Sequence, residues 1–136
     1  MKVYVTRSYW FSATHRLHSA GLSDEENRVV YGKCNNPHGH GHNYEIEVTV
    51  SGPVDPVTGR AVSLDALDML IDREVLSPLR YRNLNEEVAA FRSAVPTTEN
   101  LASEVARRLH TTWPEGPKLE KIRIHETDRN ICEISG

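Results

Sequence analysis

Three histidines alternate with two glycines in residues 38–42 (HGHGH), and this segment carries the clearest chemistry in the sequence. Neutral imidazole is a good zinc ligand, and residues two apart on a strand point the same way. His40 and His42 can therefore bind the same ion, while the glycines leave room beside it. On an extended strand the Cα atom of His38 would lie about 13 Å from that of His42, so the two rings could barely meet at one ion. We therefore expect the third ligand to come from a neighbouring strand.

His15 is the best-placed third ligand, because it ends a segment whose alternation predicts a strand over residues 2–15. Three neutral histidines leave a tetrahedral zinc ion with one open position, which is the pattern of catalytic sites and not of structural ones. Cys34 is an alternative fourth ligand that would close the site. The residues therefore predict a zinc site built on His15, His40 and His42, in either an open or a closed form.

The elements that would position these ligands follow one another as strand, strand, helix, helix, strand, strand. Ser63 is a favourable cap for the first helix, which we expect to end at Pro78 or just before it, and Thr98 is the expected cap of the second. Polar residues 18–37 are expected to form a long irregular loop. The expected strands cover residues 2–15, 40–51, 119–124 and 131–134. This order (ββααββ) predicts a single α+β domain over residues 1–136, with an antiparallel sheet covered on one face by two helices.

Composition narrows the class of protein. The 136 residues include 16 basic and 19 acidic ones, with a formal charge of −3, and no basic block that would indicate a nucleic-acid partner. No apolar run approaches the roughly 20 residues that span a bilayer, and the N-terminal residues alternate instead of forming a signal peptide. Two cysteines are too few for a disulfide scaffold, so a reducing, cytoplasmic setting is expected.

Four segments together are similar to the 6-pyruvoyl-tetrahydropterin synthase and 6-carboxy-tetrahydropterin synthase family. They are residues 11–18 (FSATHRLH), 32–44 (GKCNNPHGHGHNY), 96–100 (PTTEN) and 125–128 (HETD). The long first loop, which contains SDEEN, resembles the animal-type 6-pyruvoyl-tetrahydropterin synthases. The resemblance implies a tunnelling fold, in which trimers close their sheets into a barrel and two trimers stack as a hexamer with sites between subunits.

The resemblance also implies a substrate and a role for each matching residue. The substrate would be 7,8-dihydroneopterin triphosphate, which loses triphosphate while its side chain rearranges to a pyruvoyl group, with Mg²⁺ as a companion of the triphosphate. Cys34 would be the base, and Glu126 would anchor the pterin ring, with Thr97, Thr98 and Glu99 nearby. Taken outside the family, Glu126 reads as an exposed carboxylate at a strand end, and Cys34 as an inert thiol.

One segment departs from the family pattern. Residues 78–85 (PLRYRNLN) place Arg80 and Tyr81 where the family has an Asp-His pair that relays protons. An unperturbed tyrosine, with a pKa of about 10, transfers protons near pH 7 less easily than histidine. Tyr81 can serve as the acid, His38 or His125 can replace the missing histidine, or the relay is lost and the reaction differs.

The resulting hypothesis is a zinc-dependent lyase of the 6-pyruvoyl-tetrahydropterin synthase type whose proton relay uses Tyr81. Three alternatives stay open. The first is a 6-carboxy-tetrahydropterin synthase or another enzyme that cleaves the pterin side chain. The second is a non-catalytic protein that binds a pterin or a purine, and the third is a purely structural zinc protein.

Overall fold

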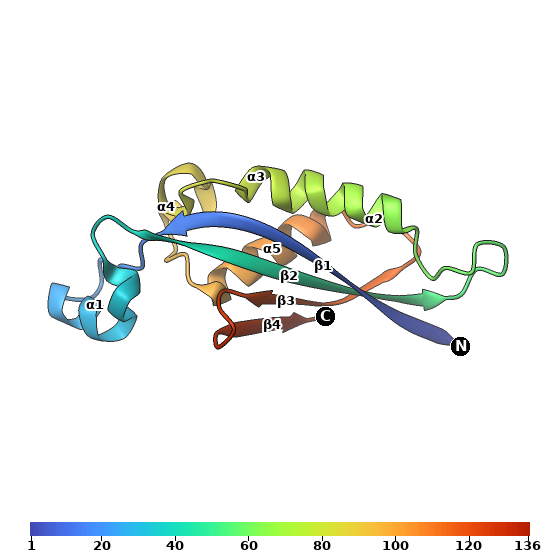
Figure 1. The fold of residues 1–136 in the computed structure, drawn as a ribbon, viewed down its shortest axis with the longest axis horizontal. Helices are drawn as coiled ribbons and strands as arrows, with labels where there is room; N and C mark the ends of the chain where they lie inside the picture. The colour runs from blue at the N-terminus through green and yellow to red at the C-terminus, as the bar shows by residue number, and fades with distance from the viewer.

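A four-stranded antiparallel sheet runs along the molecule in the computed structural model, which describes all residues 1–136 (Figure 1). Neighbouring strands follow chain order, β1-β2-β3-β4. Their bounds are Lys2–His15 for β1, His40–Pro53 for β2, Lys118–His125 for β3 and Ile131–Ser135 for β4. The predicted α+β class and the order of the strands are therefore confirmed. No helix combines the length and the apolar character needed to cross a membrane.

The pairing of β1 with β2 decides where the histidines lie. Because side chains alternate across a strand, Phe11 and Ala13 on β1 and Tyr44 on β2 are all buried on the inner face of the sheet. The register places His15 opposite His40 and Ala13 opposite His42. The alternation that builds the core therefore continues into the histidines at one end of the sheet.

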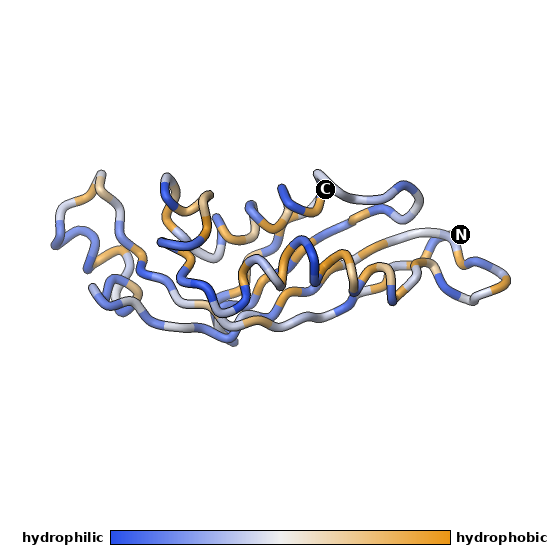
Figure 2. The backbone as a smooth tube through the Cα atoms, turned by 90° about the horizontal axis from the view of Figure 1, so that it is seen from above, coloured by the Kyte–Doolittle hydropathy of each residue, from blue (hydrophilic) through white to orange (hydrophobic).

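Two helices cover the inner face of the sheet, α2 (Leu64–Ile71) and α5 (Thr98–Thr112) (Figure 1). Ser63 caps α2 as predicted, because its hydroxyl accepts a hydrogen bond from Ala66 N at 3.3 Å. Orange and blue alternate along both strands and helices in Figure 2, which is the pattern of elements with one buried face. The buried stripe of α5 consists of Leu101, Ala102, Val105, Ala106 and Leu109.

The first helical segment extends past the expected stop. A π-helical turn (Asp72–Leu76) and a short helix α3 (Ser77–Leu79) continue α2 through Pro78. Proline cannot donate a backbone hydrogen bond, and its ring collides with the carbonyl four residues earlier in a regular helix. In the π turn, Ser77 N donates to Asp72 O, five residues back, and this wider turn accommodates Pro78. The expectation that the helix ends at or before Pro78 is wrong for this reason.

Residues 18–37 are not an irregular loop, because they contain helix α1 (Asp24–Tyr31) and a 3₁₀ turn (Gly32–Asn35). A capping box starts α1: Ser23 Oγ accepts from Glu26 N at 3.1 Å, and Ser23 N donates to Glu26 Oε1 at 2.9 Å. Asn27 is the one buried residue of α1. Figure 1 shows α1 at the end of the sheet where β1 ends and β2 begins. The remaining helical segments are α4 (Leu84–Glu87) and a 3₁₀ turn (Ala89–Arg92), which precede α5 in the chain.

Candidate metal centre

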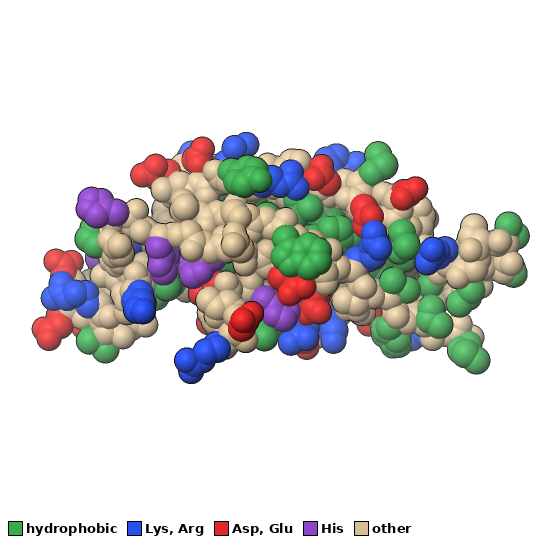
Figure 3. Space-filling view, viewed as in Figure 1, with side chains coloured by type: hydrophobic (Ala, Val, Ile, Leu, Met, Phe, Trp, Pro, Cys, Tyr) green, Lys and Arg blue, Asp and Glu red, His purple; other side chains and the backbone are tan.

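Three imidazole nitrogens converge at the end of the sheet. The Nε2 atom of His15 lies 3.2 Å from that of His40 and 3.1 Å from that of His42, and the His40 and His42 atoms are 3.2 Å apart. A tetrahedral zinc ion with Zn–N bonds of about 2.0–2.1 Å spaces its nitrogens by about 3.3–3.4 Å. The triangle therefore has the size of three ligands around one such ion. Figure 3 shows histidine side chains gathered on this part of the surface, next to α1.

His15 is oriented by the groups behind it. Its side chain is buried, and its Nδ1 lies 3.1 Å from the carbonyl oxygen of Pro96, to which it donates. That bond puts the proton on Nδ1 and leaves the Nε2 lone pair free to face the other two rings. Burial, against the opposing charge of Glu126, lowers the pKa of His15 to about 4. Burial also lowers the pKa of His42. Both rings are therefore neutral at pH 7, as metal ligands must be.

Cys34 completes the group. Its Sγ and the three histidine nitrogens all lie within 4.8 Å of one another, and together they could hold a metal ion. The 3₁₀ turn that carries Cys34 is tied to the chain after β1, because Leu17 N donates to Cys34 O at 2.7 Å. Burial and the charge of Glu126 raise the pKa of the Cys34 thiol. A nearby cation has the opposite effect and favours the thiolate. This position suits both a fourth ligand and a base.

Glu126 lies beside the metal group and is buried, in contrast to the exposed carboxylate that its residue type alone suggests. Its Oε2 accepts a hydrogen bond from Thr98 Oγ1 at 2.9 Å, and its Oε1 accepts one from Asn130 Nδ2 at 3.3 Å. Oε1 also lies 3.9 Å from His42 Nε2. A fixed carboxylate therefore flanks the histidine triangle on the side of His42.

The two threonines at the start of α5 have different contacts. Thr97, and not Thr98 as expected, caps the helix, because its Oγ1 accepts from Asn100 N at 3.1 Å. Thr98 is the first helical residue, and its hydroxyl is free to bind Glu126. Because both residues are threonine, the sequence alone does not show which of them is the cap. Glu99, the next residue, is exposed.

Tyr81 does not join this cluster within the chain. The residue is 78% exposed, and it is not one of the four residues that converge on the metal group. Its backbone has a φ of 61°, an uncommon value for a residue other than glycine, and its N donates to Ser12 O at 2.7 Å. Arg80 pairs with Asp72 at 3.3 Å. This turn therefore lies along the edge of β1, outside the histidine triangle.

Two other histidines, His38 and His125, could replace the missing histidine of the relay, but neither lies in the histidine triangle. His38 is exposed and lies outside the metal group. His125 Nε2 lies 2.8 Å from Glu47 Oε2, on the face of the sheet opposite the core. Sequence reasoning missed Asn130, which contacts both Thr98 and Glu126. The turn between β3 and β4 was the available signal, because a turn brings the residues at its two ends, here Glu126 and Asn130, close together.

The comparisons with known proteins agree over nearly the whole chain. Residues 4–136 match the 6-pyruvoyl tetrahydropterin synthase family. A 6-pyruvoyl tetrahydrobiopterin synthase of Poecilia reticulata is 52% identical over 98% of this chain and 90% of its own length. The Homo sapiens protein of that name is 46% identical over 97% of this chain and 90% of its own length. The solved structure of Caenorhabditis elegans 6-pyruvoyl tetrahydropterin synthase superposes with a TM-score of 0.91 at 40% identity, covering 100% of this chain and 96% of that one. The chain therefore belongs to the 6-pyruvoyl tetrahydropterin synthase family, as its motifs predict.

Proposed function

We propose that this chain is a 6-pyruvoyl tetrahydropterin synthase, a lyase that acts on 7,8-dihydroneopterin triphosphate. One observation carries the proposal: a carboxylate oxygen of Glu126 lies 3.9 Å from His42, a member of a histidine triangle sized for zinc. A ring anchor next to a metal group is what a pterin lyase requires. Relatives that are 46–52% identical over nearly the full chain carry this activity in their names.

Glu126 would bind the pterin ring. A carboxylate can accept two parallel hydrogen bonds, one from a ring N–H and one from the neighbouring amino group. Thr98 and Asn130 hold the carboxylate by donating to one oxygen each. Thr97 and Glu99 lie in the same helix start and would line the ring pocket. The ring therefore enters a site whose acceptor is already oriented.

His15, His40 and His42 would hold the metal, which we propose to be zinc. The donor set fits, because two of the rings are held neutral by burial and all three Nε2 atoms meet at 3.1–3.2 Å. A bound zinc ion would supply a Lewis acid for the oxygens of the substrate side chain. Mg²⁺ would enter with the triphosphate, whose oxygens it prefers.

Cys34 would remove the proton from the side-chain carbon. In the protein without metal, burial and Glu126 keep its thiol protonated by raising its pKa. A positive charge held by the three histidines would counter both effects, since thiolates form beside cations. The alternative, in which Cys34 is a fourth ligand, closes the site and makes it structural.

Tyr81 would be the acid of the altered relay, and it would act on the site of a neighbouring copy. This proposal follows from its exposure in the single chain together with the hexamer that we expect from the family, where trimers close their sheets into a barrel. A cytoplasmic location is proposed on the same family basis.

Mass spectrometry of the products tests the function directly. The purified protein, supplied with zinc and Mg²⁺, is incubated with 7,8-dihydroneopterin triphosphate. We expect release of triphosphate and a pterin with a pyruvoyl-type side chain. Recovery of the intact substrate would contradict the synthase proposal.

A specific observation favours a second candidate, a protein that binds pterin without turnover. Arg80 and Tyr81 replace the expected Asp-His pair, and neither reaches the histidine triangle within the chain. Equilibrium binding of 7,8-dihydroneopterin, together with no product from 7,8-dihydroneopterin triphosphate, would select this candidate. A cleaved side chain would instead indicate 6-carboxy-tetrahydropterin synthase chemistry or a related cleavage.

A further inference from the structure

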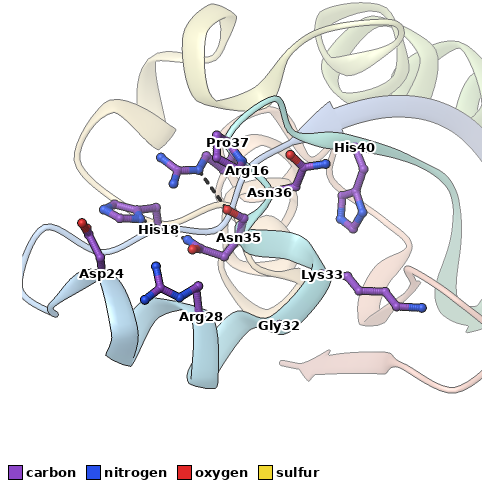
Figure 4. Close-up of a pocket in the computed structure, with 10 residues that line it drawn as sticks. All are labelled: Arg16, His18, Asp24, Arg28, Gly32, Lys33, Asn35, Asn36, Pro37 and His40. Atoms are coloured by element: carbon purple, nitrogen blue, oxygen red, sulfur yellow. Dashed lines mark hydrogen bonds between the residues drawn. The ribbon is translucent and has the colours of Figure 1, made fainter.

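A polar cavity of about 630 Å³ opens beside His40, and none of its ten lining residues is hydrophobic (Figure 4). The chain after β1 forms one wall through Arg16 and His18, and α1 forms another through Arg28. Lys33 in the 3₁₀ turn and the metal-group residue His40 complete the side away from α1. The cavity therefore shares a residue with the metal group without being part of it.

Positive charge dominates this cavity. Arg16, Arg28 and Lys33 line it, and none of the three forms an ion pair with a carboxylate of the chain. Asp24 is the one acidic residue in the lining. Arg16 is held in place, because its Nε donates to Asn35 O at 3.3 Å. Unpaired guanidinium and ammonium groups around one cavity are suited to a polyanion, since arginine binds phosphate oxygens with paired donors.

A hydrogen bond from the buried Asn35 makes His18 a further hydrogen-bond donor to the cavity. Asn35 Nδ2 donates to Leu17 O at 2.7 Å, which fixes the orientation of its amide, and the same nitrogen lies 3.0 Å from His18 Nδ1. His18 Nδ1 must therefore accept, and the proton of a neutral ring lies on Nε2. That N–H has no acceptor within the chain, so it adds a donor to the three cations.

The position of the cavity matches the order of groups in the proposed substrate. Glu126 lies on the His42 side of the histidine triangle, at 3.9 Å from that ring, whereas the cavity opens on the His40 side. A molecule whose ring binds Glu126 and whose side chain crosses the triangle would present its far end to the cavity. In 7,8-dihydroneopterin triphosphate, that far end is the triphosphate.

We propose that this cavity is the polyphosphate subsite of the enzyme, an inference that rests on the proposed function. Arg28 is its central cation, because α1 directs it towards Asn35 and His18 in the middle of the lining (Figure 4). When the carbon–oxygen bond breaks, its electron pair leaves with the triphosphate, and the proton from the adjacent carbon goes to the base. The cavity cations stabilise the negative charge of the departing group.

Inorganic tripolyphosphate is the probe for this subsite, with the zinc-loaded protein as the receptor. Arg28→Gln should weaken its binding about tenfold, which corresponds to about 1.4 kcal/mol, whereas Arg28→Lys should retain most of it. Asp24→Asn removes the opposing charge and should strengthen binding, a gain that misfolding cannot produce. Arg60→Gln is the matched control, because Arg60 is exposed in the turn after β2, at the other end of that strand.

Titration calorimetry measures each dissociation constant, and zinc content is checked afterwards to exclude chelation by the probe. Binding of 7,8-dihydroneopterin, which lacks phosphate, should be unchanged in Arg28→Gln. Equal tripolyphosphate binding by Arg28→Gln, Asp24→Asn and the Arg60→Gln control would overturn the subsite, even if the enzyme turned over its substrate. Arg28-dependent binding without turnover would uphold the anion site and reject the proposed function.

Discussion

Thr98 donates a hydrogen bond from its hydroxyl to Glu126 at 2.9 Å, and this bond joins the first turn of α5 to the residue that follows β3. Both side chains are buried. Asn130 donates to both of them, at 3.2 Å to Thr98 and 3.3 Å to Glu126. The carboxylate is therefore held by two donors, while the cap of α5 is the separate residue Thr97.

We expect the two neighbouring threonines to separate binding from stability. Thr98→Val should weaken binding of 7,8-dihydroneopterin about tenfold, because it removes a donor that orients a charged acceptor. Thr97→Ala should lower the free energy of unfolding by about 1 kcal/mol through loss of the cap, with a much smaller loss of pterin affinity than in Thr98→Val, because Thr97 makes no contact with Glu126. Calorimetry and urea unfolding measure the two quantities. Thr98→Ser keeps the hydroxyl and should restore affinity; a loss equal to that of Thr98→Val would contradict the assignment.

Metal content distinguishes the ligands from the neighbouring histidine. His40→Ala should abolish zinc retention through gel filtration, since it removes one corner of the triangle. His38→Ala should retain about one zinc per chain, because His38 is exposed and outside the metal group. Elemental analysis of the eluted protein measures both variants. Zinc loss in His38→Ala but not in His40→Ala would reverse the ligand set.

The same measurement decides the role of Cys34. Cys34→Ala should keep its zinc and lose turnover if the thiolate is the base. Parallel loss of zinc and turnover would instead identify Cys34 as the fourth ligand of a closed site. Its Sγ, within 4.8 Å of all three histidine nitrogens, is compatible with either result.

Tyr81 should matter for turnover and not for folding. Tyr81→Phe should lower kcat at least about 100-fold, the scale of a lost general acid, with zinc content and pterin affinity unchanged. Tyr81→Gly should be equally slow yet at least as stable as wild type, because glycine adopts a φ of 61° without strain. Steady-state kinetics and thermal unfolding measure the two effects. An unchanged kcat in Tyr81→Phe would remove Tyr81 from the mechanism.

The metal group was predictable because a strand has a geometric period of two. Alternation along β1 and β2 placed His15 and His42 on the core face before any pairing was known, and the register then brought His15 opposite His40. Helix α1 was missed because it has no apolar stripe: its one buried residue is the polar Asn27. Only the Ser23–Glu26 capping box marked its start.

Other features depend on packing between distant segments, which local patterns do not encode. Glu126 is buried because the start of α5 packs against the turn after β3, a contact across 28 residues to Thr98. The π turn before Pro78 lets the helix continue although proline lacks a backbone N–H donor. In a sequence, a proline by itself indicates only a probable end of the helix. The cavity beside His40 arises from α1, the element that alternation could not predict.

Glu104 should make stability depend on pH in the acid range. Burial raises its pKa, but the hydrogen bond from Arg107 and the charges of Arg108 and Arg107 outweigh burial, and the net pKa is lowered from its usual 4.5. A lowered pKa in the folded state means that the unfolded chain binds the proton more readily. The contribution of the Glu104 carboxylate to the free energy of unfolding is therefore complete above about pH 4.5. It is lost as the pH falls through the lowered pKa of the folded state.

Glu104→Gln tests this sign. At pH 7 it should lower the free energy of unfolding by about 1–2 kcal/mol, because the amide cannot form charged bonds to the two arginines. Urea unfolding of both proteins from pH 7 to pH 3 should show the difference shrinking towards the acid end. A difference that stays constant with pH would mean that the carboxylate charge contributes nothing.

Gly39 should be required for the geometry of the metal group, and Gly41 should not. A Cβ on Gly39 would lie 2.9 Å from the carbonyl oxygen of His15, and its φ of 72° is strained for other residues. Relief of that clash moves the start of β2, and with it His40, away from His15. We therefore expect Gly39→Ala to lower both zinc affinity and the free energy of unfolding.

Gly41→Ala is the matched control, because Gly41 lies only two residues further along, inside β2. Its Cβ would meet Thr14 Cγ2 at 3.5 Å and Ala13 O at 3.6 Å, which are ordinary contacts. Zinc affinity, measured by competition with a chelator, should therefore fall about tenfold or more in Gly39→Ala and stay close to wild type in Gly41→Ala. Equal affinities for the two variants would show that the approach of β2 to His15 does not set the spacing of the ligands.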